Sequence, residues 1–199
     1  MEVNSYRIEE PDTKPEEMTH LYGDRLTQKD NPVIIFRSKL DSLCAMILES
    51  QVLGEEKENP GFVDDLQKIL EFVRSLFTVE YNCVPLGEFS ILGYSSKELR
   101  EISHNPEKYF GYKHLLMHHS MGPLSLRLNL LRATVRETEI AAVAVLREPT
   151  VCNSATRNLQ YSKCCRMEIV EALNRLSSLF YILIYKYLPI DYSPKDYSP

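Results

Sequence analysis

Apolar residues recur at intervals of three and four over four long stretches of the chain, and this periodicity predicts four long helices. The first is expected over residues 33–52, directly after Pro32, because proline is favoured at the first position of a helix. Gly54 and the charged stretch EEKENPG are expected to end it. The other three long helices are expected over residues 61–79, 123–147 and 162–188.

The connection between the second and third of these helices is long and less regular. Within it, SSKELREISH predicts one short helix over residues 96–104, with a serine cap and an acidic first turn. The stretch HNPEKYFGYKHLLMHHSMGP predicts a loop or a broken helix, and long loops in compact domains are more often functional than idle. No strand-like alternation of any length is present. The sequence therefore predicts an all-α fold, an up-and-down bundle of four long helices and one or more short ones.

The two ends of the chain differ from the middle. Residues 1–31 carry prolines and charges with little periodicity, which predicts an N-terminal arm that orders only on a partner or ligand. Residues 32–190 are expected to form the bundle domain. Residues 191–199, the tandem repeat DYSPKDYSP, are expected to be a flexible tail.

The composition argues against several classes of protein. A net charge of −5 without a long basic run disfavours nucleic-acid binding. The longest apolar run, residues 179–188, is too short to span a bilayer and contains Lys186. The N-terminus lacks the apolar core of a secretory signal. The five cysteines, odd in number and two of them adjacent, favour reduced thiols over a disulfide framework, so we expect a soluble cytoplasmic protein with no membrane partner.

The helix expected over residues 123–147 is apolar nearly all round, apart from one narrow polar sector. Arg132, Arg136 and Glu139 lie along that sector, together with Asn129, at intervals of three and four. Burying an unpaired charge costs at least several kcal/mol. These side chains must therefore face a carboxylate, a bound anion, or water in a cleft.

Two interpretations of this polar sector remain open. In the first, Arg136 and Glu139 form a structural ion pair, worth about 0.2–0.5 kcal/mol on an exposed helix. In the second, the arginines bind an anion in a groove between helices or subunits, because the planar guanidinium suits phosphate. Other helices carry side chains that could face the same groove, namely Asp41 in the first and Asn174, Arg175, Ser178, Tyr181 and Tyr185 in the last.

Several blocks of sequence, in the right order, resemble the cobalamin adenosyltransferases of the PduO and EutT types. The blocks RATVRETE and ALNRLSS are similar to an Arg-x-x-x-Arg-x-x-Glu helix and an Asn-Arg-Leu-Ser helix of that family, and THLYGDRLTQKDNPVIIFRSKLDSL is similar to its N-terminal block. ISHNPEKYFGYKHL and LNLLRATVRETE resemble the ethanolamine-utilisation branch, the EutT type, in particular. The resemblance covers about residues 19–188, most of the chain.

The resemblance implies a homotrimer of ferritin-like five-helix bundles with active sites between subunits. It implies transfer of the 5′-deoxyadenosyl group of ATP, with Mg²⁺, to the Co(I) of cobalamin and release of triphosphate. A role in ethanolamine utilisation follows from the branch that the chain resembles. The resemblance leaves open a flavoprotein reductase as electron donor and an association with a metabolic microcompartment.

The same resemblance assigns roles to a catalytic set of four residues. Asp41 of one subunit is expected to pair with Arg132 of the next. Arg136 would meet the phosphates of ATP, and Glu139 would orient an arginine or the nucleotide.

Further ATP-binding positions are implied in the N-terminal block and the last helix. Lys29 would be a second phosphate contact, and Arg25 belongs to the Gly-acidic-Arg turn of that block. Asn174 would lie beside the nucleotide or its metal ion, with support from Arg175 and Ser178. The family often has aspartate where this chain has Ser178, so a role that needs a carboxylate there is not carried over.

The corrinoid is expected to contact the loop before the arginine helix. Cobalt(II) is hard to reduce while a lower axial ligand donates to it, and family members displace that ligand with an apolar side chain. Leu116 is the nearest match, and Leu115 and Met117 fit almost as well. The three could equally be core residues beneath a loop.

Two features of the family are missing from this chain. Its phosphate loop, Thr-Arg-Thr-Gly-Asp near the N-terminus, is absent. No cysteine precedes Cys44, so the EutT-type metal site of one histidine and a Cys-Cys-x-x-Cys cluster is not expected, and we predict no protein metal site. The missing loop keeps open an alternative function, a catalytically inactive helical scaffold or nucleotide-sensing protein of the same fold. An interaction module of a microcompartment is a third class.

Overall fold

The computed structural model describes residues 14–23, 25–148 and 159–192, except for the side chains of residues 159–164. The expected tail from residue 193 onward, the first part of the expected arm and the segment 149–158 lie outside the described residues. No helix in the described part of the chain is both long enough and apolar enough to cross a membrane.

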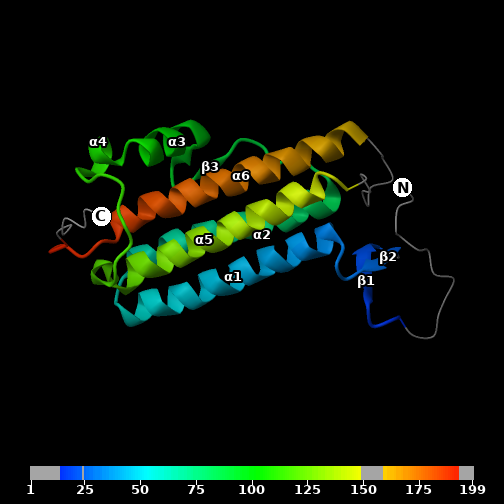
Figure 1. Ribbon diagram of the computed structural model, residues 1–199, viewed down its shortest axis with the longest axis horizontal. Coiled ribbons are helices and arrows are strands. Elements are labelled where there is room, and N and C mark those ends of the chain that lie inside the picture. Colours follow the sequence, from blue (N-terminus) through cyan, green and yellow to red (C-terminus); the bar gives the residue numbers. More distant parts are fainter. Residues whose placement is uncertain (1–13, 24, 149–158, 193–199) are drawn as a thin grey trace.

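Four long helices form the bundle (Figure 1). They are α1 (Pro32–Glu56), α2 (Pro60–Asn82), α5 (Gly122–Val145) and α6 (Leu159–Lys186). Each packs against two of the others, α1 against α2 and α5, and α6 against α5 and α2. The predicted helical fold is therefore confirmed, and the short helix α3 (Ser96–His104) packs on the outside of α6.

The direction of the helices departs from strict up-and-down alternation. In Figure 1, α1 and α6 run one way, whereas α2 and α5 both run the other way. The long connection between α2 and α5 returns the chain to the end where α2 began, and it carries α3, α4 (Pro106–Phe110) and the 3₁₀ turn His119–Met121 on its way. Because this crossover is long, α5 can start at the same end of the bundle as α2 (Figure 1).

Local signals set the starts of the helices. The Asn31 side chain accepts a hydrogen bond from the Val33 backbone N–H at 2.9 Å, and the Asn59 side chain accepts one from the Phe62 N–H at 3.0 Å. Both caps precede a proline at the first helical position. The serine cap predicted for α3 is confirmed, with Ser95 as the cap and bounds that agree with the expected residues 96–104. The structure adds that Ser95 and Glu98 form a capping box.

The predicted end of the first helix is wrong, because α1 passes through Gly54 and continues to Glu56. Gly54 is buried against α2. A Cβ at this position would lie 2.7 Å from Phe62 Cδ1 and 2.9 Å from Val63 Cγ2. The glycine is therefore needed for the close approach of α1 and α2, and it does not stop the helix.

Two short antiparallel hairpins are present where no strands were predicted. Strand β1 (Met18–Tyr22) pairs with β2 (Arg25–Gln28), and β3 (Ser90–Ile91) pairs with β4 (Tyr94–Ser95). Leu21 and Tyr22 of the first hairpin belong to the hydrophobic core of the bundle, and Leu26 is buried as well. This part of the expected arm is thus packed without any ligand. An isolated hairpin of this size is marginal in water, so its contacts with the helices, and not its own pattern, stabilise it.

Candidate active site

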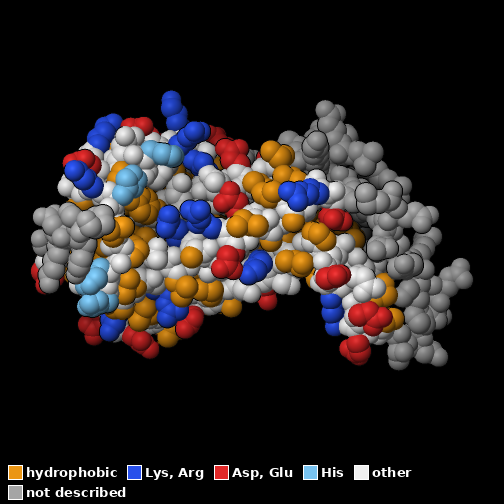
Figure 2. Space-filling view, in the orientation of Figure 1, with side chains coloured by type: hydrophobic (Ala, Val, Ile, Leu, Met, Phe, Trp, Pro, Cys, Tyr) orange, Lys and Arg blue, Asp and Glu red, His pale blue; other side chains and the backbone are white. Residues whose placement is uncertain are grey.

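The polar sector predicted on α5 faces a matching polar line on α6. Asn174 of α6 donates a hydrogen bond from Nδ2 to Glu139 Oε1 of α5 at 2.9 Å, and Arg175 Nη2 donates to Asn174 Oδ1. Ser178 continues the line one turn further, with its hydroxyl bonded to the Asn174 carbonyl at 3.5 Å. Figure 2 shows Lys and Arg side chains gathered over the middle of this face, with Asp and Glu side chains beside them. The structure therefore brings the predicted residues of α5 and α6 together in one seam.

Glu139 of α5 bonds Asn174 of α6, and this contact helps to decide between the structural ion pair and the anion site. The structural ion pair between Arg136 and Glu139 does not occur among the described ion pairs. Arg136 is exposed and has no ion pair with any described carboxylate. Its charge is therefore available to an anion from outside the chain.

Arg132 lies against an aromatic ring. Its guanidinium is 5.3 Å from the centre of the Tyr181 ring, and its Nη1 makes a long hydrogen bond of 3.5 Å to Asn129 Oδ1. A cation over a ring face gains about 0.5–2 kcal/mol, which orients the arginine but leaves most of its hydrogen-bond donors unused.

Arg175 has a buried donor without a partner. Its Nε atom is inaccessible to solvent and finds no acceptor in the described structure. Leaving such a donor unsatisfied costs about 1–3 kcal/mol, more for a charged group. Arg132, Arg136 and Arg175 together give the seam a strong preference for a polyanionic ligand.

Asp41 does not meet Arg132 within the chain. On α1, Lys39 points toward α5 and pairs with Glu137 at 2.7 Å. Asp41 follows two residues later, about 200° further round the helix, and its side chain is exposed. A contact between Asp41 and Arg132 therefore requires two different chains.

Lys29 and Arg25 lie on the N-terminal hairpin and not in the seam. Arg25 begins β2 and is half-buried, whereas Lys29 is exposed in the turn after β2, where its backbone N–H bonds the Glu17 carbonyl at 2.9 Å. The hairpin packs at the end of the bundle where α1 begins (Figure 1). No described contact joins either side chain to Arg136, so the structure leaves these two predicted phosphate contacts apart from the others.

The three residues predicted to contact the corrinoid differ in their exposure to solvent. Leu115 and Met117 are half-buried and pack against the hydrophobic core, whereas Leu116 is 67% exposed. A core role thus accounts for Leu115 and Met117 but not for Leu116, which projects an apolar side chain into solvent.

A chain of hydroxyl groups holds this loop on α6. His114 Nδ1 and Tyr181 Oη share a hydrogen bond of 2.8 Å, Tyr181 and Tyr185 hydroxyls share one of 2.7 Å, and Tyr185 donates to the Lys113 carbonyl at 3.2 Å. Burial, followed by the hydrogen bond with Tyr181, raises the pKa of Tyr185 above its ordinary value, so it remains a donor at neutral pH. The guanidinium of Arg132 lies over the ring of Tyr181, so Tyr181 contacts both the loop at His114 and the seam at Arg132.

The sequence placed Tyr181 and Tyr185 among the side chains that could face the groove, but it assigned them no specific role and did not include His114. The available signal was the spacing of four that places Tyr181 and Tyr185 on the same line of α6 as Asn174 and Ser178. Nothing in the sequence showed that His114, far away in the chain, would reach that line.

The described residues contain no group of three or more His, Cys, Asp or Glu side chains placed to hold a metal ion. His118 Nδ1 instead shares a hydrogen bond of 2.9 Å with Ser120 Oγ. Cys44 and Cys165 are buried, and burial raises the pKa of both thiols. Cys83 is disulfide-bonded, a departure from the reduced thiols that the cysteine pattern favoured.

Comparison with known proteins identifies a matching family and relatives with similar sequences. A family model described as cobalamin adenosyltransferase matches residues 11–187. The chain is 34% identical over 171 residues to the corrinoid adenosyltransferase EutT of Salmonella typhimurium, and equally to that of Escherichia coli K12. These matches cover 86% of this chain, which spans only 58% of the length of those relatives. No solved structure matches the chain.

Proposed function

The chain belongs to the cobalamin adenosyltransferase family, and we propose that it transfers the 5′-deoxyadenosyl group of ATP to Co(I) of cobalamin in ethanolamine utilisation. The observation that carries it is the α5–α6 seam, where three guanidinium groups lack any ion-paired carboxylate among the described residues. A triphosphate is the kind of ligand that such a seam stabilises.

The reaction needs positioning and charge neutralisation more than a protein base. Co(I) of the substrate donates an electron pair to C5′ of the ribose, and the C5′–O bond breaks with its electron pair on the departing triphosphate. Negative charge thus grows on the leaving group. Arg175 is already oriented by its bond to Asn174, so it can stabilise that charge with little reorganisation. Arg136 is exposed on the same seam and adds a second positive charge.

Glu139 and Asn174 are the polar groups that order the seam. Glu139 accepts the Asn174 amide, and Asn174 accepts Arg175, so each fixes the orientation of the next. Mg²⁺ that arrives with ATP prefers oxygen donors, and the carboxylate of Glu139 is of that type.

Leu116 is proposed to contact the corrinoid. An exposed apolar side chain cannot donate electrons to cobalt, so it can occupy the lower axial side while the donating ligand is displaced. The hydroxyl chain through Tyr181 would hold this loop in register with Arg132, which joins the corrinoid side of the site to the phosphate side.

A homotrimer is proposed from the outward face of α5. Large apolar side chains are exposed there, with Leu130 at 47%, Ile140 at 71% and Val143 at 37%. A second copy of the chain would cover them, as expected for an interface. In this assembly Asp41 of one subunit would reach Arg132 of the next, and Lys29 and Arg25 would approach a seam on a neighbouring subunit. We also propose a flavoprotein reductase as the electron donor, a cytoplasmic location and an association with a metabolic microcompartment.

Direct assay tests the proposed activity. The purified chain is mixed with ATP, Mg²⁺ and chemically reduced cobalamin in the dark. We expect a light-sensitive adenosyl product, followed by its absorption spectrum, and one triphosphate released for each product formed. ATP binding without product would support the sensing alternative, and absence of both binding and product would support a scaffold.

A further inference from the structure

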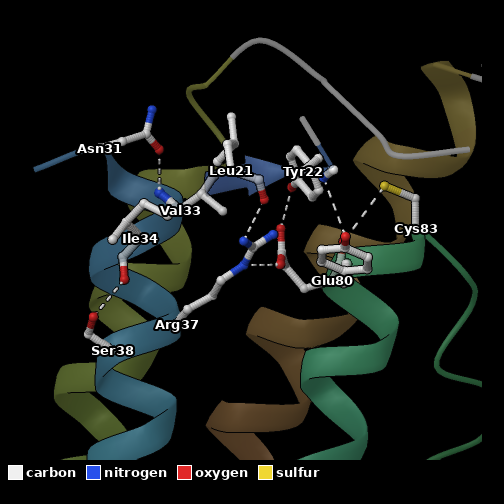
Figure 3. A network of polar contacts seen from close by, with 11 residues as sticks. Leu21, Tyr22, Asn31, Val33, Ile34, Arg37, Ser38, Glu80 and Cys83 are labelled. Carbon is white, nitrogen blue, oxygen red and sulfur yellow. Dashed lines mark hydrogen bonds and ion pairs between the residues drawn. The ribbon is translucent and has the colours of Figure 1, made fainter. Parts of the chain in front are cut away.

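A buried polar network joins the N-terminal hairpin to two helices, and the reaction described above does not use it (Figure 3). Its centre is Glu80 of α2, whose side chain is only 2% exposed. Arg37 Nε of α1 donates to Glu80 Oε2 at 2.7 Å, and the Tyr22 hydroxyl of β1 donates to Glu80 Oε1. Arg37 Nη1 also donates to the Leu21 carbonyl at 2.7 Å.

Aromatic rings complete the surroundings of Arg37. Its guanidinium lies 4.7 Å from the centre of the Tyr22 ring and 5.4 Å from that of Tyr81. The Tyr81 hydroxyl accepts a hydrogen bond from the backbone N–H of Gly23 at 3.4 Å. Residues of α1 and α2 therefore contact the hairpin at its main chain and at a side chain.

Stability alone is a weak explanation for this network. Removing a carboxylate and a guanidinium from water costs several kcal/mol, and well-packed apolar residues often replace such a pair without loss. A hydrogen-bonded pair differs from apolar packing in its directionality, because each donor must meet its acceptor in one geometry. Burial, then the charge of Glu80, raises the pKa of Tyr22 above its ordinary value, so its hydroxyl remains a donor throughout the physiological range.

The hairpin that this network holds carries two of the proposed ATP contacts. β1 pairs with β2 in a register that sets Thr19 opposite Thr27 and Tyr22 opposite Arg25. Lys29 follows β2 directly, tied back to Glu17. The orientation of β1 on the bundle therefore fixes where both cationic side chains point.

We propose that Tyr22, Arg37 and Glu80 are positioning residues, which hold the hairpin so that Arg25 and Lys29 reach the triphosphate. The proposal rests on the proposed function and adds to it a determinant of ATP affinity outside the seam. None of the three residues needs to touch the nucleotide.

Tyr22→Phe is the test, because it removes one hydroxyl and keeps the ring that packs on Arg37. We expect the KM for ATP to rise about tenfold, the order of one hydrogen bond to a charged group, with kcat and the KM for cobalamin within about twofold. Tyr187→Phe is the matched control, since Tyr187 donates to Asp65 at 2.8 Å at the opposite end of the bundle (Figure 1). It should leave all three constants unchanged.

A double variant separates positioning from a general loss of stability. If the network acts through Lys29, adding Tyr22→Phe to Lys29→Ala should raise the KM for ATP little further, because the two changes are coupled. Arg37→Lys, which keeps the charge but loses the planar guanidinium that bonds Glu80 and Leu21 from two different nitrogens, should repeat the Tyr22→Phe result.

A lowered melting temperature with an unchanged KM for ATP in Tyr22→Phe would overturn the proposal, as would fully additive effects. Failure of the proposed function looks different. A wild-type chain that binds ATP but makes no adenosyl product would refute the proposed activity alone. The variants would then be compared by their dissociation constants for ATP in place of the KM. A wild-type chain that does not bind ATP would refute both.

Discussion

Arg136 has the least protein around it of the three arginines in the seam. Arg132 rests on the ring of Tyr181, and Arg175 bonds Asn174, but Arg136 is exposed and pairs with no described carboxylate. An exposed guanidinium on a surface otherwise rich in apolar side chains has little to contribute to the stability of a single chain. Its contribution should therefore appear in ligand binding.

Arg136→Ala is expected to weaken ATP binding by about 10–100-fold, the effect of losing charged hydrogen bonds worth about 1.5–3 kcal/mol. Calorimetric titration with Mg·ATP measures it. Arg127→Ala is the matched control on the same helix, because Arg127 pairs at 3.0 Å with the exposed Glu49. Wild-type ATP affinity in Arg136→Ala, with the helical content unchanged, would refute the assignment of this residue.

Leu116 offers a second test at this scale. Leu116→Ser should raise the KM for cobalamin by about tenfold or more, since an apolar side chain that becomes buried on binding is worth about 1.5–3 kcal/mol. The KM for ATP should stay the same. Leu48→Ser, at a residue of α1 that is 44% exposed, serves as the control in steady-state kinetics. Equal behaviour of the two variants would exclude Leu116 from the corrinoid site.

At the scale of elements, the contact between α1 and α2 depends on a missing side chain. Gly54 lies inside α1, where glycine costs about 1 kcal/mol relative to alanine. The close approach of the Phe62 ring explains why the glycine is nevertheless present. Packing between helices here overrides the intrinsic preference of a single residue.

Gly54→Ala is expected to lower the free energy of unfolding by about 1–2 kcal/mol, because overpacking costs more than helix propensity returns. Urea titration followed by circular dichroism measures the change. Gly61→Ala is the control in the adjacent helix, since a Cβ there would meet nothing closer than 3.7 Å and should be neutral or slightly stabilising. A stabilised Gly54→Ala variant would show that the two helices can move apart freely.

At the scale of the whole molecule, the trimer proposal predicts that a second copy of the chain contacts the carboxylate of Asp41 and the apolar outer face of α5. Asp41→Asn removes one charge and changes little else, so a single chain should keep its stability. In an assembly, the same change would leave Arg132 buried without its carboxylate, a loss of several kcal/mol for each interface.

We therefore expect Asp41→Asn to shift the assembly toward monomers at micromolar concentration, as measured by analytical ultracentrifugation. Asp64→Asn makes the same chemical change at an exposed position of α2 and should leave the assembly intact. Unchanged sedimentation and activity in Asp41→Asn would mean that this carboxylate belongs to the solvated surface.

Sequence reasoning succeeded where the physics is local. Helix hydrogen bonds join residues four apart, and capping joins residues three apart, so periodicity and the Ser95 cap predicted the four long helices and the bounds of α3. The same local spacing placed Arg132 and Glu139 on one sector of α5. The resemblance to a known family supplied roles for these residues that spacing alone did not provide.

Tertiary structure decided what joins residues far apart in the chain. It set α2 and α5 in the same direction, folded the N-terminal hairpin onto the bundle, and joined Glu139 to Asn174. Tyr22 and Glu80 are 58 positions apart, and no pattern along the sequence connects them. The packing of the folded chain decides which group lies within hydrogen-bond distance of a buried charge. The sequence by itself therefore determined the helices and the residue types of the site, while the choice of partners came only from the folded chain.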